Sequence, residues 1–295
     1  MKPERKRFWS NSGPWMFIFP AFIIYFLFML IPILGTLGLS FTTWSGIDIS
    51  NITFVGFENY QSLFQNNIFW IALRNSLIFV VGSVIFQVLL GLVMALLLEK
   101  ERPFGNFIRG SFFIPSMLAL IVVGIVFETL LNPALGILDT IFEGMGLEMF
   151  TGIGMLLQTK KAMIVLVLLQ VWYGFGWSMF IFISRLKSIN PQLYEAAYVD
   201  GTSEWQRILY ITLPQLKGTF VVAVLFAATW AMKIFTLPFV MTRGGPDHAT
   251  EVLATIAYDH GLTYNNIGYG SAISMLLIIS GTVIGYLVYN FIGKE

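Results

Sequence analysis

Six long apolar stretches constrain the fold of this 295-residue chain more than any other feature. Each reaches the length of about 20 residues that a helix needs to cross a bilayer. None alternates polar and apolar residues as a membrane β-strand does. The chain is therefore predicted to be an all-α, polytopic membrane protein, with transmembrane helices at Trp15–Phe41, Ile71–Leu98, Phe107–Leu131, Ala162–Leu186, Thr219–Val240 and Tyr269–Ile292.

Composition supports this class and excludes others. Hydrophobic residues make up 57% of the chain and charged residues 11%, whereas soluble domains have about 45–50% and 25%. A net charge of +1 without a basic array argues against nucleic acid as a partner. The absence of cysteine excludes disulfides, thiolate metal ligands and cysteine nucleophiles. The first stretch is too long for a signal peptide and lacks a small-residue cleavage site, so it is expected to remain as an anchor.

The distribution of Lys and Arg predicts the orientation, because positively charged loops are retained in the cytoplasm. With six spans and a cytoplasmic N-terminus, both termini lie inside. Lys233 falls within a span. Four basic residues fall on the outer side of the membrane: Arg74, Lys160, Lys161 and Arg243. The other twelve fall on the inner side: Lys2, Arg5, Lys6, Arg7, Lys100, Arg102, Arg109, Arg185, Lys187, Arg207, Lys217 and Lys294.

We divide the chain into a cytoplasmic tail at residues 1–14, a first transmembrane helix with its outer loop at 15–68, and a core of five transmembrane helices at 69–292. No repeat or flexible linker interrupts that core. The outer connections at about Thr42–Trp70 and Asn132–Lys161 are expected to be solvated loops. His248 and His260 are expected to be solvated loop residues as well, because no H-E-x-x-H pattern surrounds them.

The longest inner segment carries the pattern of two short helices joined by a glycine. Asn190-Pro191 predicts a capped helix start, and Gln192–Asp200 suits a helix. Gly201 permits the positive φ of a turn. A second helix is predicted at about Ser203–Tyr210, ended by Pro214. Two interpretations stay open on this pattern alone: a projecting surface for a partner, or an amphipathic helix lying in the membrane interface.

A resemblance favours the first interpretation. Glu195-Ala196-Ala197, three residues, Gly201, nine residues and then Ile211-x-Leu213-Pro214 resemble the signature loop of permease subunits from binding-protein-dependent ABC importers. Further segments resemble the sugar-uptake branch of that family: Val55-Gly56-Phe57-Glu58-Asn59-Tyr60, Gly136-Ile137-Leu138-Asp139, Ile189-Asn190-Pro191-Gln192-Leu193-Tyr194 and Thr242-Arg243-Gly244-Gly245-Pro246.

The resemblance implies the type I ABC importer permease fold and a non-enzymatic half-channel in the bacterial cytoplasmic membrane. Its implied partners are a second homologous permease subunit, two copies of an ATP-binding subunit and an extracytoplasmic solute-binding protein. The chain has no phosphate-binding loop, so ATP would be hydrolysed by partner subunits and no cofactor is expected here. The implied ATPase-coupling residues are Glu195, Ala196, Ala197, Asp200, Gly201, Ile211, Leu213 and Pro214.

The substrate pathway is predicted in the fourth and fifth spans. Lys233 is a candidate because a charge within a span usually faces a cavity or a partner. Aromatic faces and amides suit sugar rings and their hydroxyls, which selects Gln170, Tyr173, Trp177 and Trp230. Helix packing and membrane-interface placement remain alternative roles for each of these.

Other functions stay open on the sequence. The permease could carry glycerol-3-phosphate or another polar solute in place of an oligosaccharide or disaccharide. A self-contained channel or secondary transporter would leave the signature loop unexplained. A membrane scaffold without transport is the third alternative, and it predicts that deletion of the chain leaves sugar uptake unchanged.

Overall fold

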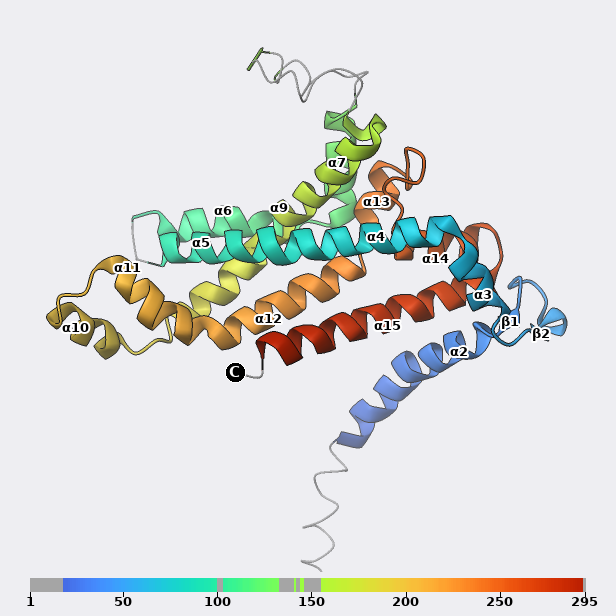
Figure 1. Cartoon of the computed structure of the whole chain (residues 1–295), viewed down its shortest axis with the longest axis horizontal. Coiled ribbons are helices and arrows are strands. Elements are labelled where there is room, and N and C mark those ends of the chain that lie inside the picture. Colours follow the sequence, from blue (N-terminus) through green and yellow to red (C-terminus); the bar gives the residue numbers. More distant parts are fainter. Residues whose placement is uncertain (1–17, 100–102, 133–140, 142–143, 146–154, 294–295) are drawn as a thin grey trace, which may run out of the picture. The chain divides into compact units, whose positions relative to one another are not determined.

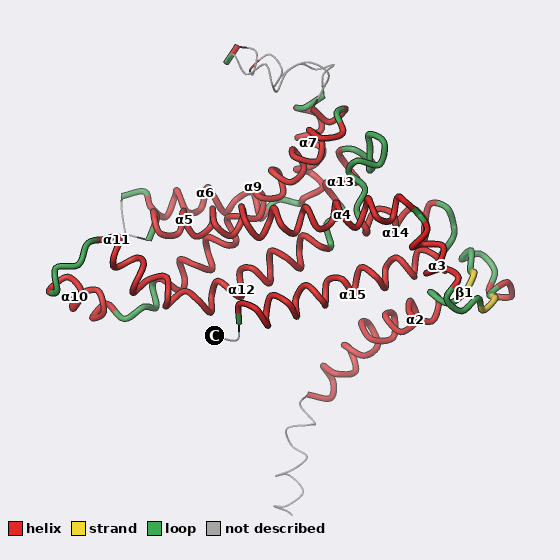
Figure 2. Tube along the Cα trace, viewed as in Figure 1, coloured by secondary structure: helices red, strands yellow, loops and turns green. Residues whose placement is uncertain are grey.

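The computed structural model describes residues 18–99, 103–132, 141, 144–145 and 155–293. The basic N-terminal tail, Lys100, Arg102, Lys294 and the Gly136–Asp139 match lie outside these residues. The described chain is mostly helical, with connecting loops and one short two-stranded ribbon (Figure 2). Chain contacts group Met1–Gln65 with Ala257–Met275 in a first unit, and Asn66–Ile256 with Leu276–Glu295 in a second.

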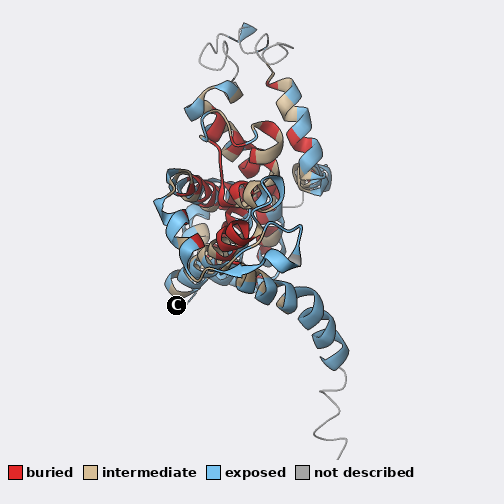
Figure 3. Ribbon diagram, turned by 90° about the vertical axis from the view of Figure 1, so that its right-hand side faces the viewer, coloured by how far each residue is buried: buried red, intermediate tan, exposed pale blue. Residues whose placement is uncertain are grey.

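The first predicted span begins the first unit. Residues 18–25 are helical, and η1 (Phe26–Leu30), a π-helical stretch, and α2 (Ile31–Leu39) follow without a break. No residue in the most apolar window of this 22-residue helix is buried, and Figure 3 draws the helix mostly as exposed. Large apolar side chains exposed along a whole helix require lipid or another protein around them.

Side-chain hydrogen bonds order the connection that follows this span. It holds β1 (Thr42–Thr43), η2 (Ile49–Asn51), β2 (Thr53–Phe54) and α3 (Glu58–Gln65). Asn59 Nδ2 donates to the carbonyl oxygens of Ser40 and Thr42, both at 2.9 Å. The Tyr60 hydroxyl lies 2.7 Å from Ser40 Oγ. Asn59 and Tyr60, the last two residues of the Val55–Tyr60 segment, thus hold this loop against the end of α2.

His260 corrects one expectation. It lies in η7 (Asp259–Thr263), which follows α14 (Leu253–Tyr258). Its ring centroid is 4.6 Å from that of Tyr269 and 5.4 Å from that of Tyr264. Burial between these rings lowers the pKa of His260 below its usual value. The prediction of a solvated loop histidine was wrong, because the local turn brings two tyrosine rings onto the imidazole.

Helices of the second unit pack around a common core. The second predicted span is α4 (Asn67–Gly82), η3 (Ser83–Gln87) and α5 (Val88–Leu98). It packs on α9 (Thr159–Leu186) and α12 (Leu213–Met232), which form the fourth span and most of the fifth (Figure 1). Fully buried side chains such as Phe182 and Leu216 fill the space between them. A Cβ at Gly91 would lie 2.6 Å from Ser178 Cβ, so only glycine permits this approach of α5 to α9.

The third predicted span is not one straight helix. Among the described residues, five helices are long and apolar enough to cross a membrane, the fifth ending at Ile292 in α15 (Ile267–Ile292). The sixth crossing exists only if α6 (Gly105–Met117) and α7 (Leu120–Leu130), bent by 92°, are taken together. Pro115 removes a backbone donor from α6, and extended backbone at Leu118 and Ala119 then turns the chain.

The fifth predicted span is broken as well. Its α12 ends at Met232, and α13 (Thr236–Met241) starts after a short turn. The two displaced pieces, α7 and α13, lie against each other (Figure 1). Gly124 allows this contact, because an added Cβ there would lie 3.3 Å from Val240. The sequence also predicts that Pro115 kinks or breaks its helix, and the bend of the third span confirms this. The break after Met232 was not predicted, because hydropathy measures apolar length and not the direction of a helix.

Candidate functional site

The signature segment forms α10 (Pro191–Val199), a helix capped at both ends. Asn190 is the N-cap, and its Oδ1 accepts the amide of Gln192 at 3.0 Å. Pro191 occupies the first turn, where a missing amide hydrogen costs nothing. The predicted helix start is therefore confirmed in its cap and its proline.

A paired turn ends α10. The amide of Gly201 bonds to the carbonyl of Tyr198, and the amide of Thr202 reaches back to the carbonyl of Ala197, both at 3.1 Å. This pattern is a Schellman motif, which requires a left-handed residue after the C-cap. Asp200 is that C-cap and Gly201 has φ +72°. The elbow is thus fixed by backbone bonds and depends on a residue that tolerates a positive φ.

The second short helix does not end at Pro214, which corrects the prediction. Ser203 and Gln206 form a capping box at the start of α11 (Glu204–Arg207). The helix continues through η6 (Ile208–Thr212), a π-helical stretch, directly into α12. Pro214 lies in the first turn of α12, and the wider π turn before it relieves the clash that proline causes within a helix. The signature segment is therefore fused to a core helix.

The α10–α11 segment exposes large apolar and aromatic side chains, although it connects two membrane spans. Tyr198, Val199 and Trp205 are 74%, 85% and 75% exposed. Beside them, α10 and α11 enclose a groove of about 1120 Å³ with the end of α5, and Glu195 lies on its wall. Among the other signature residues, Ala196, Asp200 and Pro214 are exposed, Ile211 and Leu213 are half-buried, and Ala197 is buried. Exposed apolar patches of this kind mark contacts with a protein or with a membrane surface.

One hydrogen bond joins α10 to the fused helix. The Tyr194 hydroxyl and Thr212 Oγ1 are 3.0 Å apart. Burial raises the pKa of Tyr194 above its usual value, so this phenol keeps its proton at neutral pH. Movement of α10 is thereby linked to η6 by a side-chain contact as well as by the chain itself.

A second candidate site is a cavity of about 260 Å³ between η3, α6, α9 and α12. Four of the five predicted pathway residues line it: Gln170, Tyr173, Trp177 and Trp230. Trp177 is 53% and Trp230 is 59% exposed. The structure therefore brings these four together, from two helices whose pairing the sequence did not specify.

Two amides in this cavity have unused hydrogen-bonding capacity. Gln170 is 1% and Gln87 is 8% exposed, and neither Oε1 atom has a hydrogen-bond partner among the described residues. Gln87 Nε2 reaches Ser178 Oγ only at 3.5 Å. A buried acceptor without a partner costs about 1–3 kcal/mol. Both oxygens are themselves buried, so a hydroxyl of a ligand in the cavity would bond them only if the amides turned toward it.

Tyr173 has a structural partner in addition to its place in the cavity wall. Its hydroxyl donates to the carbonyl oxygen of Leu118 at 3.0 Å. That carbonyl stands at the break between α6 and α7, where no helical amide follows to bond it. Tyr173 thus holds the break as well as presenting its ring to the cavity.

Lys233 lies apart from the cavity. It is the C-cap of α12, at the turn before α13, and its side chain is exposed. It does not belong to the cavity lining. The sequence placed it inside a continuous span, whereas the structure places it at a break.

Sequence reasoning missed Gln87, Ser116, Ser178 and Phe226 in the cavity wall. Gln87 had a usable signal, because it is the only amide in the apolar run from Leu77 to Leu98. Phe226 had none, since phenylalanines are abundant in every span. Only the packing of α12 on α9 selects it.

Comparisons with known proteins agree with this architecture. Residues 87–294 match the family described as "Binding-protein-dependent transport system inner membrane component". The chain is 34% identical over 286 residues to the probable ABC transporter permease protein YurN of Bacillus subtilis, covering 96% of this chain and 97% of that protein. It is 28% identical to the multiple sugar-binding transport system permease protein MsmF of Streptococcus mutans, covering 90% of each.

A solved structure has the same fold. A chain of a bacterial ABC transporter involved in the import of the acidic polysaccharide alginate superposes with a TM-score of 0.83 at 21% identity. The alignment covers 98% of this chain and 99% of that one.

Proposed function

This chain belongs to the family of binding-protein-dependent transport system inner membrane components, and from that premise we propose that it forms half of a saccharide path through the membrane. As a permease it is not an enzyme. The cavity between α9 and α12 carries the proposal: two indole faces beside two buried amides with unpaired oxygens. Aromatic rings stack on sugar faces, and amides bond sugar hydroxyls.

The named cargo of relatives supports a saccharide. MsmF belongs to a multiple sugar-binding system, and a further relative is named an arabinooligosaccharide transport permease. Among the residues that line the cavity, only Tyr173 is ionisable. A phosphate or carboxylate would enter without a counter-charge, which is costly in a low-dielectric site. We therefore favour an uncharged oligosaccharide or disaccharide over glycerol-3-phosphate.

The same proposal assigns α10 as the coupling helix. Its exposed patch and groove would dock on one of two ATP-binding subunits in the cytoplasm, with Glu195 at the contact. Residues Glu204–Met232 form one continuous helix. A displacement of α11 would therefore move Trp230, which lines the cavity near the other end of that helix. The chain would bind no cofactor itself, and ATP would be hydrolysed by those partners. Both termini would be cytoplasmic.

Two further partners complete the assembly. A second, homologous permease would close the open side of the cavity, where Trp177 and Trp230 are exposed. An external solute-binding protein would deliver the saccharide, as the name of the family implies. Lys233 stays a candidate for a contact with cargo or with the second permease, because its exposed charge stands at a helix break inside the fifth span.

Reconstitution tests the proposal. The chain is assembled in proteoliposomes with the second permease, the ATP-binding subunits and the solute-binding protein of its transport system. Uptake of labelled maltotriose, raffinose and lactose is then measured with and without ATP. We expect ATP-dependent uptake of at least one saccharide and none of glycerol-3-phosphate. Uptake that needs no ATP-binding subunit would favour a self-contained transporter.

A further inference from the structure

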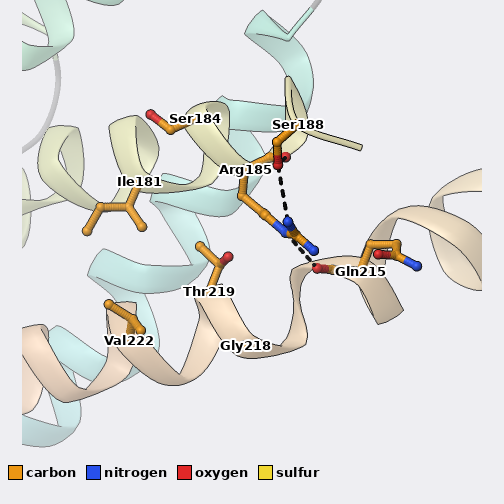
Figure 4. Close-up of a pocket in the computed structure, with 8 residues that line it drawn as sticks. All are labelled: Ile181, Ser184, Arg185, Ser188, Gln215, Gly218, Thr219 and Val222. Atoms are coloured by element: carbon orange, nitrogen blue, oxygen red, sulfur yellow. Dashed lines mark hydrogen bonds between the residues drawn. The ribbon is translucent and has the colours of Figure 1, made fainter. Parts of the chain in front are cut away.

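A second pocket of about 530 Å³ lies between the ends of α9 and α12 that face the α10–α11 segment (Figure 4). Its walls differ from those of the cavity lined by Gln170, Tyr173, Trp177 and Trp230, called the aromatic cavity below. Hydroxyls of Ser188 and Thr219, the amide of Gln215 and the guanidinium of Arg185 line it. In Figure 4, Arg185 of α9 extends toward Gln215 of α12.

The two pockets lie on one continuous seam. Both have Ile181 in their lining. The wall residues recur every three or four positions on each helix, which places them on one face. They are Tyr173, Trp177, Ile181 and Arg185 on α9 with Ser188 in the turn after it, and Trp230, Phe226, Val222, Thr219 and Gln215 on α12. From Tyr173 to Arg185 the seam runs about 18 Å along α9. A solute leaving the aromatic cavity toward α10 would therefore meet the second pocket next.

Arg185 has donors to spare in this pocket. Its Nε donates to the carbonyl oxygen of Gln215 and its Nη1 to Ser188 Oγ, both at 3.2 Å. A guanidinium has five N–H donors, and across the described chain Arg185 has no carboxylate partner. The remaining donors are available to hydroxyl oxygens of a solute, while the two recorded bonds hold the fork in place.

The pocket also has open space that no packing requires. A Cβ added at Gly218 meets no atom within 4 Å, whereas glycines elsewhere on these helices, such as Gly174 and Gly176, stand against neighbouring atoms. No helix contact requires a glycine at residue 218, and its open space lies on the pocket wall.

We propose that this pocket is a second saccharide-binding station, an exit site in which Arg185, Gln215 and Thr219 bond the hydroxyls of cargo that has left the aromatic cavity. The inference rests on the proposed function and on its orientation, which puts this pocket at the cytoplasmic end. The exit station replaces aromatic stacking by exchangeable hydrogen bonds. Cargo is thus held weakly where it must be released to water.

Cysteine protection tests occupancy of the station directly, since the chain has no cysteine of its own. Thr219→Cys places one thiol in the pocket, and Lys187→Cys places a control thiol on the exposed end of α9 outside it. Both are labelled with a membrane-impermeant maleimide in the assembled importer during ATP turnover. We expect maltotriose, or whichever probe is imported, to at least halve labelling of Thr219→Cys and to leave Lys187→Cys unchanged. Equal labelling of Thr219→Cys with and without the imported sugar would overturn the proposal.

Filling the pocket gives an independent measurement. Gly218→Leu adds a side chain to the open space, where its Cβ meets no atom within 4 Å, and Gly285→Leu is the matched control at another open glycine outside the pocket. Uptake per assembled complex should fall about tenfold for Gly218→Leu and stay near wild type for Gly285→Leu. Wild-type uptake by Gly218→Leu would refute the exit station. A wild-type complex that imports none of the probes would instead refute the proposed function.

Discussion

The α10–α11 segment and the aromatic cavity are two functional regions of one chain, built in opposite ways. The segment consists of consecutive residues, and its caps, elbow and capping box are all local bonds. The cavity draws one amide from η3 and the rest of its wall from α6, α9 and α12. Because its hydrogen bonds are local, the α10–α11 segment can be rigid while its outer surface remains exposed. An assembled cavity depends on every helix that contributes to it.

The largest effect is expected at the elbow of the segment. Gly201→Val forces a β-branched residue into φ +72°, although no atom blocks the new side chain. A left-handed backbone costs such a residue at least about 1–2 kcal/mol, so α10 should lose its fixed direction. ATP-driven uptake should fall about thirtyfold while the cavity stays intact.

Gly201→Asn is the control for that change, because asparagine tolerates the left-handed region. It should keep most of the uptake, measured per assembled complex. Equal loss in both variants would show that size, and not backbone conformation, matters at the elbow.

A smaller effect is expected in the cavity. Gln170→Met keeps the length of the side chain and removes the oxygen without a partner. Removal of an unpaired buried acceptor should leave the melting temperature of the purified chain unchanged or raise it. Uptake should nevertheless fall about tenfold. Gln61→Met on the exposed face of α3 should alter neither quantity, and a lower melting temperature for Gln170→Met would assign Gln170 a packing role.

The number of ATP molecules hydrolysed per saccharide imported should distinguish a tryptophan of the cavity from a tryptophan of the α10–α11 segment. Trp177→Ala removes a cavity ring worth about 0.5–1.5 kcal/mol in stacking. It should lower uptake several-fold with normal ATP hydrolysis, so that more ATP is spent per saccharide. Trp205→Ala changes the exposed patch of α11, and should lower hydrolysis and uptake together. The comparison between the regions breaks down if both variants change that ratio equally.

The smallest effect concerns the bond that joins α10 to η6. Tyr194→Phe removes the 3.0 Å contact with Thr212, which is worth about 0.5–1.5 kcal/mol. A drop of a few degrees in melting temperature is expected. Tyr210→Phe is the matched control, since Tyr210 is 77% exposed and should shift nothing. Because the pKa of Tyr194 is raised, the difference between the variants should not depend on pH near neutrality.

Apolar length alone was enough to locate the membrane spans but not their direction. Hydropathy treats Phe107–Leu131 as one span, while Pro115 and the extended residues Leu118 and Ala119 split it into two helices at 92°. Pro214 shows the opposite error. A proline rule predicts a helix end there, but the π-helical turn of η6 lets the helix continue.

The sequence by itself determined the membrane class, the family signature and the local structure from Asn190 to Gln206, because caps and a glycine elbow depend only on residues a few positions apart. It also selected Gln170, Tyr173, Trp177 and Trp230 by chemistry. Tertiary structure alone decided that these four share one cavity with Gln87, and that the seam continues to Arg185. Which faces of two helices meet is set by contacts between residues far apart in the chain, such as Gly91 with Ser178, and no local pattern records them.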